Sequence, residues 1–168
     1  MEKVKAVAGI DIGGTSTTFG FVDRSGEILA GGQIITNQYD KHEDFVAALY
    51  EKMMITAQNP DYDIEILGFG IGAPMGNINK GTIEYAANLP WKGIVPLADL
   101  FARHTPLPVI VTNDANAAAV GEMVFGGARG MKNFVVITLG TGLGSGFVVD
   151  GKLVYGHDGF AGELGHTT

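Results

Sequence analysis

Hydrophobic and polar residues follow one another in a pattern that predicts three strands first and alternating helices and strands afterwards. The first strands are expected at residues 4–12, 17–23 and 28–36. Later apolar runs predict strands at 64–74, 107–114 and 133–139, with a loop after the first of them. Helices are expected between Asp40 and Asn59, at 96–104 and at 115–125. This order indicates a mixed sheet in an α/β protein.

Capping signals mark the ends of the predicted helices. Asp40 and Glu43 have the spacing of a capping box at the start of the first helix. Pro96 suits the first turn of the second helix, and Gly126-Gly127 is a typical end for the third.

One segment of the chain occurs twice. Residues 138–156 lie without a gap on residues 12–30, at an offset of 126 positions, so that a glycine-threonine turn is repeated. The repeat predicts a second copy of the three-stranded unit from about residue 131, but no helix follows to cover it. We therefore expect a complete small lobe at 1–113 and the truncated beginning of a larger, similar lobe at 114–168.

Composition and charge exclude several function classes. The chain has 168 residues, of which 46% are hydrophobic, as in an ordinary globular protein. Its net charge of −7 argues against a nucleic-acid groove or an anionic membrane as partner. Cysteine is absent, and the N-terminal apolar run is too short for a signal peptide or a membrane span. These features predict a soluble, cytoplasmic protein.

The repeated turns are candidate phosphate-binding sites. Glycine lets an anion approach several backbone N–H groups at once, and two such turns facing each other could hold one polyphosphate. Each turn alone could be a tight hairpin, but the ungapped repeat favours a nucleotide. Asp11 lies just before the first turn, where a carboxylate beside phosphate calls for Mg²⁺ between them. The turn residues are Gly13, Gly14, Thr15, Gly140, Thr141 and Gly142.

Two further groups of polar residues allow more than one interpretation. Asp114 follows Asn113 at the end of a predicted strand, where it could cap the next helix or act as a general base. The segment 157–166 contains His157, Asp158, Glu163 and His166. It could bind a metal, recognise sugar hydroxyls or form a solvated loop.

Six ordered motifs resemble one known family. They are AGIDIGGTSTTFGFVD, GFGIGAPMGNI, AANLPW, NDANAAAVGE, ITLGTGLGSGFVVDGKLVYG and GFAGELGH. In order and spacing they are similar to the ROK family of sugar kinases and sugar-responsive repressors, over nearly the whole chain. The resemblance implies the ribonuclease H-like fold of the actin, heat-shock chaperone and sugar-kinase superfamily, with two lobes flanking a cleft.

The resemblance also implies roles for single residues. Asp114 matches the catalytic base, and the two turns match the ATP phosphate loops. The implied sugar-binding residues are Gly76, Asn88, Asn113, Asp114, Glu163 and His166. His166 also matches a zinc ligand that acts with three cysteines, which would follow Thr168. Structural zinc is therefore expected only in a longer protein.

The implied function is transfer of the ATP γ-phosphoryl group to a hexose, with glucose as the first expectation and Mg²⁺ as cofactor. Kinases for N-acetylmannosamine or fructose are alternatives, as is a sugar-binding repressor, which would carry a helix-turn-helix domain before the first strand. An isolated interaction module is a third class. We expect a homodimer or higher homo-oligomer. The 168-residue chain alone is expected to be inactive and free of zinc, and to self-associate through residues 131–156 or be disordered there.

Overall fold

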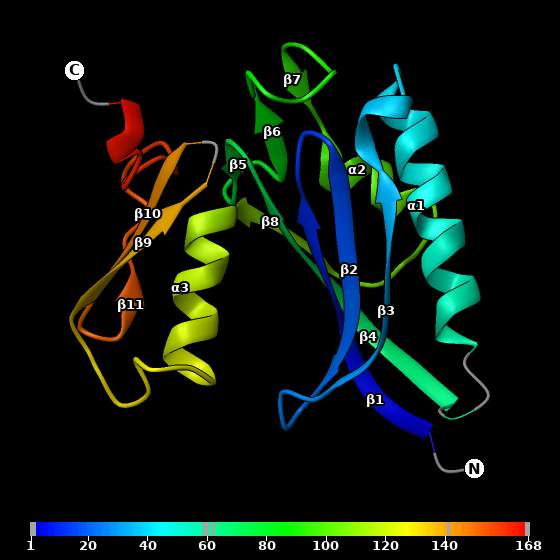
Figure 1. The fold of residues 1–168 in the computed structure, drawn as a ribbon, viewed down its shortest axis with the longest axis horizontal. Helices are drawn as coiled ribbons and strands as arrows, with labels where there is room; N and C mark the ends of the chain where they lie inside the picture. The colour runs from blue at the N-terminus through cyan, green and yellow to red at the C-terminus, as the bar shows by residue number, and fades with distance from the viewer. Residues whose placement is uncertain (1–2, 59–60, 62, 141, 167–168) are drawn as a thin grey trace.

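A five-stranded mixed sheet forms the centre of the computed structural model, which describes residues 3–58, 61, 63–140 and 142–166 (Figure 1). Its strand order is β3-β2-β1-β4-β8. The strands are β1 (Lys3–Ile12), β2 (Ser16–Asp23), β3 (Ile28–Ile35), β4 (Asp63–Ala73) and β8 (Val109–Asn113). The first three are antiparallel neighbours, whereas β4 runs parallel to both β1 and β8. The mixed α/β sheet predicted from the sequence is confirmed.

Helices α1 (His42–Ala57) and α2 (Leu97–Ala102) cover one face of this sheet (Figure 1). Alternate residues of β1, including Ala8 and Ile10, are buried against them. Phe45, Leu49 and Met53 of α1 are fully buried, as their spacing predicts. The second helix begins at Leu97, one residue later than expected, so that Pro96 is its N-cap residue and not part of its first turn.

The capping box expected at the start of α1 is wrong. The N-cap residue is Lys41, which makes no side-chain capping bond, and the helix begins at His42. Asp40 therefore lies one residue too early to cap. Glu43 and Asp44 occupy the first turn instead, where negative charge complements the helix dipole.

A second small sheet occupies the region expected to be a loop. Its strands are β5 (Gly76–Asn77), β6 (Thr82–Glu84) and β7 (Ile94–Val95), in the order β5-β6-β7. Strands of two or three residues are too short to show a periodic pattern, so the sequence gives no signal for them. The β5–β6 hairpin lies close to the amino end of helix α3 (Asp114–Val124) in Figure 1.

Helix α3 lies between the central sheet and a third sheet of β9 (Phe134–Leu139), β10 (Leu143–Val149) and β11 (Lys152–Leu153) (Figure 1). Glycines allow this close packing: a Cβ on Gly146 would lie 2.8 Å from that of Ala119, and one on Gly72 would lie 3.3 Å from that of Ala117. None of the helices in the described part of the chain has the length and apolar character needed to cross a membrane.

The sequence repeat is also a structural repeat. Strands β1–β2 and β9–β10 are both antiparallel hairpins, and the carboxyl ends of β1 and β9 lie toward the same end of the molecule (Figure 1). The Gly13 N–H donates to the Ser16 carbonyl at 3.0 Å, and the Gly140 N–H donates to the Gly142 carbonyl at 3.0 Å.

The outer face of the third sheet is exposed. Val135 and Ile137 are each 47% exposed, and Leu139 is 82% exposed. Within the described residues, no helix lies over this outer face. The expectation that no helix covers the sheet is wrong for its inner face, where α3 packs against β10. Self-association through this sheet stays a prediction.

Candidate active site

Asn113 and Asp114 lie where β8 ends and α3 begins. Asn113 is 8% exposed, and its Oδ1 accepts a hydrogen bond of 2.8 Å from the backbone N–H of Ala115. Asn113 is therefore the N-cap of α3, and the interpretation of Asp114 as the cap is wrong. Asp114 is the first helical residue, and its side chain is exposed, with Oδ1 2.7 Å from the same N–H. Its second oxygen is not needed by the helix.

The side chain of Asn113 also reaches a distant part of the chain. Its Nδ2 donates a 2.9 Å hydrogen bond to Oε1 of Glu163. Two residues that the sequence marks as sugar ligands are thus brought together from positions 50 residues apart. In this arrangement the amide and the carboxylate satisfy each other, and a ligand hydroxyl could take the place of either partner.

Asp11 brings a second carboxylate to the same region. It lies in β1 between Thr18 of β2 and Gly72 of β4. Burial raises the pKa of Asp11, and the negative charge of Asp114 raises it further. The two carboxylates are therefore close enough to repel each other, and a cation between them would relieve that repulsion.

This carboxylate pair suits Mg²⁺ better than a metal bound by protein alone. Mg²⁺ is usually held by one or two carboxylates together with water and substrate phosphates. No group of three or more His, Cys, Asp or Glu side chains that could hold a metal ion occurs in the described part of the chain. The residues present fit Mg²⁺ if phosphate supplies further oxygens.

The same residues do not fit a structural zinc site. Such a site normally needs four protein ligands, and the sequence contains no cysteine. The side chain of His166, the remaining candidate ligand, lies outside the described part of the structure. His157 and Asp158 are exposed, and Nε2 of His157 lies 3.9 Å from Oδ1 of Asp158.

The first glycine-threonine turn packs against the loop that carries Asn88. A Cβ on Gly14 would collide with the Asn88 carbonyl oxygen, so this contact needs glycine. The Thr15 carbonyl accepts a 2.8 Å hydrogen bond from the N–H of Thr36, which fixes the other side of the turn. Asn88 itself is exposed. The structure thus joins a candidate phosphate-binding turn to a candidate sugar-binding loop.

The second turn is more open. No atom lies within 4 Å of the position that a Cβ would take on Gly140 or Gly142. Gly144, just beyond the turn, lies close to Asp114. A Cβ built on Gly144 would be 3.9 Å from Oδ1 of the Asp114 carboxylate. Thr141, a predicted phosphate-binding residue, lies outside the described residues.

Gly76 has a structural reason to be glycine. A Cβ at this position would collide with the backbone of Thr112 in β8. Its neighbour Asn77 was not singled out from the sequence, although its side chain is completely buried and both its amide nitrogen and its amide oxygen are hydrogen-bonded. A polar residue in a glycine-rich loop is too common to mark such a position in advance.

Known proteins are similar to this chain over nearly its whole length, as the motifs are. The model of the ROK family matches residues 7–168. A glucokinase of Halalkalibacterium halodurans is 40% identical over 164 residues, which make up 95% of this chain and 49% of that protein. A xylose repressor of Caldicellulosiruptor bescii is 36% identical over 178 residues, covering 99% of this chain and 42% of the repressor.

A solved structure shows the same fold. A ROK family glucokinase from Streptomyces griseus, in complex with glucose and AMPPNP, matches with a TM-score of 0.84 at 37% identity. The match covers 96% of this chain and 50% of that chain. The predicted ribonuclease H-like α/β fold is therefore confirmed, and the chain spans about half the length of the curated relatives it matches.

Proposed function

The chain belongs to the ROK family, and from this premise we propose that the natural protein containing it is an ATP-dependent hexose kinase that acts on glucose. One observation carries the proposal. The Asn113–Glu163 hydrogen bond assembles a polar site beside Asp114, whose exposed carboxylate is not required as a helix cap. A site of this kind can bind hydroxyls and accept a proton from one of them.

In the proposed reaction, Asp114 is the general base. The 6-hydroxyl oxygen of the sugar attacks the γ-phosphorus, and the bond from that phosphorus to the bridging oxygen of ADP breaks. The hydroxyl proton passes to the Asp114 carboxylate. Asn113 and Glu163 orient the sugar through its other hydroxyls, together with Asn88, Gly76 and His166. Such orientation supplies much of the rate enhancement in phosphoryl transfer.

The phosphates of ATP are proposed to lie against the two glycine-threonine turns, Gly13 to Thr15 and Gly140 to Gly142. Backbone N–H groups in such turns stabilise negative charge without a lysine. Asp11 would hold Mg²⁺, through water or directly, and the ion would neutralise charge on the phosphates. The raised pKa of Asp11 supports this role, because its carboxylate lies in a partly buried position that gains from a cation.

The proposed lobes, 1–113 and 114–168, meet at the Asn113–Asp114 bond. A change in the angle between them would therefore act directly on the base and on its neighbour. Closure would exclude water, which could otherwise accept the phosphoryl group. We propose that the natural protein is a homodimer or higher homo-oligomer, which light scattering would test.

A sugar-binding repressor of the same family is the second candidate. The xylose repressor that matches 99% of the chain supports it. The exposed carboxylate of Asp114, which α3 does not use as its N-cap, favours the kinase, because a protein that only binds sugar needs no general base. N-Acetylmannosamine and fructose remain alternative substrates.

A coupled assay of the natural gene product against a panel of hexoses tests the proposal. The value of kcat/KM for ATP-dependent phosphorylation should be highest with glucose. A protein that binds sugar but phosphorylates none of the panel would contradict the kinase and support the repressor. A higher kcat/KM for N-acetylmannosamine or fructose would keep the reaction and change the substrate.

A further inference from the structure

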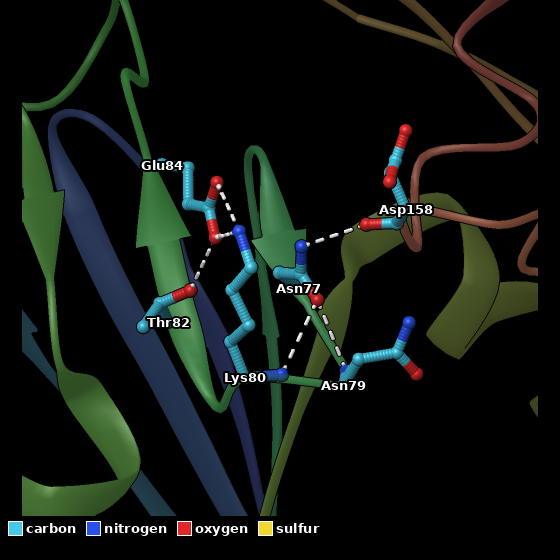
Figure 2. A network of polar contacts seen from close by, with 6 residues as sticks. All are labelled: Asn77, Asn79, Lys80, Thr82, Glu84 and Asp158. Atoms are coloured by element: carbon cyan, nitrogen blue, oxygen red, sulfur yellow. Dashed lines mark hydrogen bonds and ion pairs between the residues drawn. The ribbon is translucent and has the colours of Figure 1, made fainter.

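A buried asparagine ties the small β5–β6 hairpin to the segment that carries Glu163. Asn77 of β5 is 0% exposed. Its Oδ1 accepts hydrogen bonds from the backbone N–H groups of Asn79 at 3.0 Å and Lys80 at 3.3 Å. Its Nδ2 donates a 2.9 Å hydrogen bond to the carbonyl of Asp158, 81 residues away, and Figure 2 shows both sets of bonds. The Asn77 side chain thus stabilises its own turn and also holds the distant segment at Asp158.

The hairpin that carries Asn77 is braced by contacts of its own. Oγ1 of Thr82 donates to Oε1 of Glu84 at 2.9 Å, and Nζ of Lys80 lies 3.0 Å from the same oxygen (Figure 2). Both Thr82 and Glu84 are buried. These contacts stabilise the hairpin that carries Asn77, whose Nδ2 donates to a partner outside the hairpin.

The partner segment is shaped to receive Asn77. Gly159, which follows Asp158, is buried and has a φ of 86°, in the left-handed region that favours glycine. A Cβ on Gly159 would lie 2.9 Å from Oδ1 of Asn77. A side chain at position 159 would therefore push the segment away from the asparagine.

The segment 158–163 is held at both of its ends. Asn77 holds it at Asp158, and Asn113 holds it at Glu163. The two attachments differ in one respect. A bound hexose would compete for the polar groups of Asn113 and Glu163, whereas the buried Asn77 bond to a backbone carbonyl needs no change when sugar binds.

We propose that Asn77 is a positioning residue, which keeps the 158–163 segment in place so that Glu163 meets the sugar. This role rests on the proposed function. Asn77 acts through Glu163 and has no role in the transfer of the phosphoryl group. Its loss should weaken hexose binding and leave ATP binding and the chemical step nearly unchanged.

The substitution Asn77→Asp tests this role with little change in shape. The carboxylate keeps an acceptor for the N–H groups of Asn79 and Lys80 but loses the donor to the Asp158 carbonyl. Leaving a buried polar group unpaired costs about 1–3 kcal/mol, which is a roughly 5- to 150-fold effect. In the natural gene product we expect the hexose KM to rise by about tenfold or more, with kcat within about threefold and the ATP KM within about twofold of wild type.

Two further variants serve as controls. Thr82→Val removes a hydrogen bond inside the same hairpin without touching the distant segment, and should leave the hexose KM within about twofold of wild type. Gly159→Ala approaches the contact from the other side and should reproduce the selective rise in hexose KM. If Asn77→Asp does not fold, Gly159→Ala still tests the proposal.

Hydrogen exchange supplies a readout that does not depend on catalysis. Amides of residues 157–163 should exchange faster in Asn77→Asp than in Thr82→Val. Wild-type hexose KM and unchanged exchange in both contact variants would overturn the inference while leaving the kinase intact. A rise in both KM values, or a loss of kcat alone, would also overturn it. A wild-type protein without hexose kinase activity would overturn the proposed function and the positioning role together. This holds even if hydrogen exchange at residues 157–163 is faster in Asn77→Asp than in Thr82→Val.

Discussion

Replacing Asp114 by Asn separates the proposed chemistry of this residue from its place in the fold. The helix cap is Asn113, and the only cost to α3 is the loss of a negative charge from its first turn. Such a charge contributes about 0.3–1 kcal/mol at an exposed helix start. The free energy of unfolding should therefore fall by no more than about 1 kcal/mol.

The expected kinetic effect is much larger. Removal of a general base lowers the rate by about 10²- to 10⁴-fold, or roughly 3–5 kcal/mol of transition-state stabilisation. In the natural gene product, kcat should fall by that factor while the hexose and ATP dissociation constants change little. Loss of the charge should also lower the pKa of Asp11 toward its usual value, because Asp114 contributes to raising it. Single-turnover kinetics and a carbon-13 NMR titration of Asp11 measure the two effects.

Asp99→Asn is a matched control. Asp99 is also an exposed carboxylate in the first turn of a helix, α2, so its replacement should cost a similar amount of stability. It should leave kcat unchanged. The reasoning is refuted if Asp114→Asn keeps more than about a tenth of wild-type kcat, or if both variants lose activity equally.

Four further substitutions probe the rest of the site. Asp11→Asn removes a group whose pKa is raised in the folded protein, so urea unfolding should show a stability gain at neutral pH that shrinks as the pH falls toward 3.8; a gain that grows on acidification would contradict this. Glu163→Gln should weaken hexose binding more than ATP binding, and equal losses in calorimetry would remove Glu163 from the sugar site. Gly14→Ala should destabilise the fold, because its Cβ would collide with Asn88. Gly140→Ala has free space and should spare stability while raising the ATP KM, if phosphate approaches that turn.

Much of the fold could be predicted because its signals are local. Long strands and helices bury every second or every fourth residue, and β1, α1 and α3 all show these periods. The repeated turns could be found without any periodic pattern, because the two segments match without a gap at a fixed offset. Both hairpins form with the expected antiparallel pairing.

Other features depend on contacts between distant residues and gave no local signal. The cap of α3 is Asn113 because the strand ends one residue earlier than its apolar run suggests. Asn113 meets Glu163, and Asn77 meets Asp158, only because the chain returns to the amino end of α3 after the third sheet. The motifs could therefore name candidate ligands, whereas the geometry was needed to show that Asn77 fixes one of the segments.

The most direct test of the account is phosphorus-31 NMR of the natural gene product with ATP, Mg²⁺ and glucose. We predict that the γ-phosphate signal of ATP is replaced by that of a phosphomonoester on the 6-oxygen of glucose. The Asp114→Asn protein, folded and still binding both ligands, should form this product at least about a hundredfold more slowly. Release of free phosphate without a sugar ester, or equal product formation by both proteins, would contradict the assignment of a hexose kinase site built around Asp114.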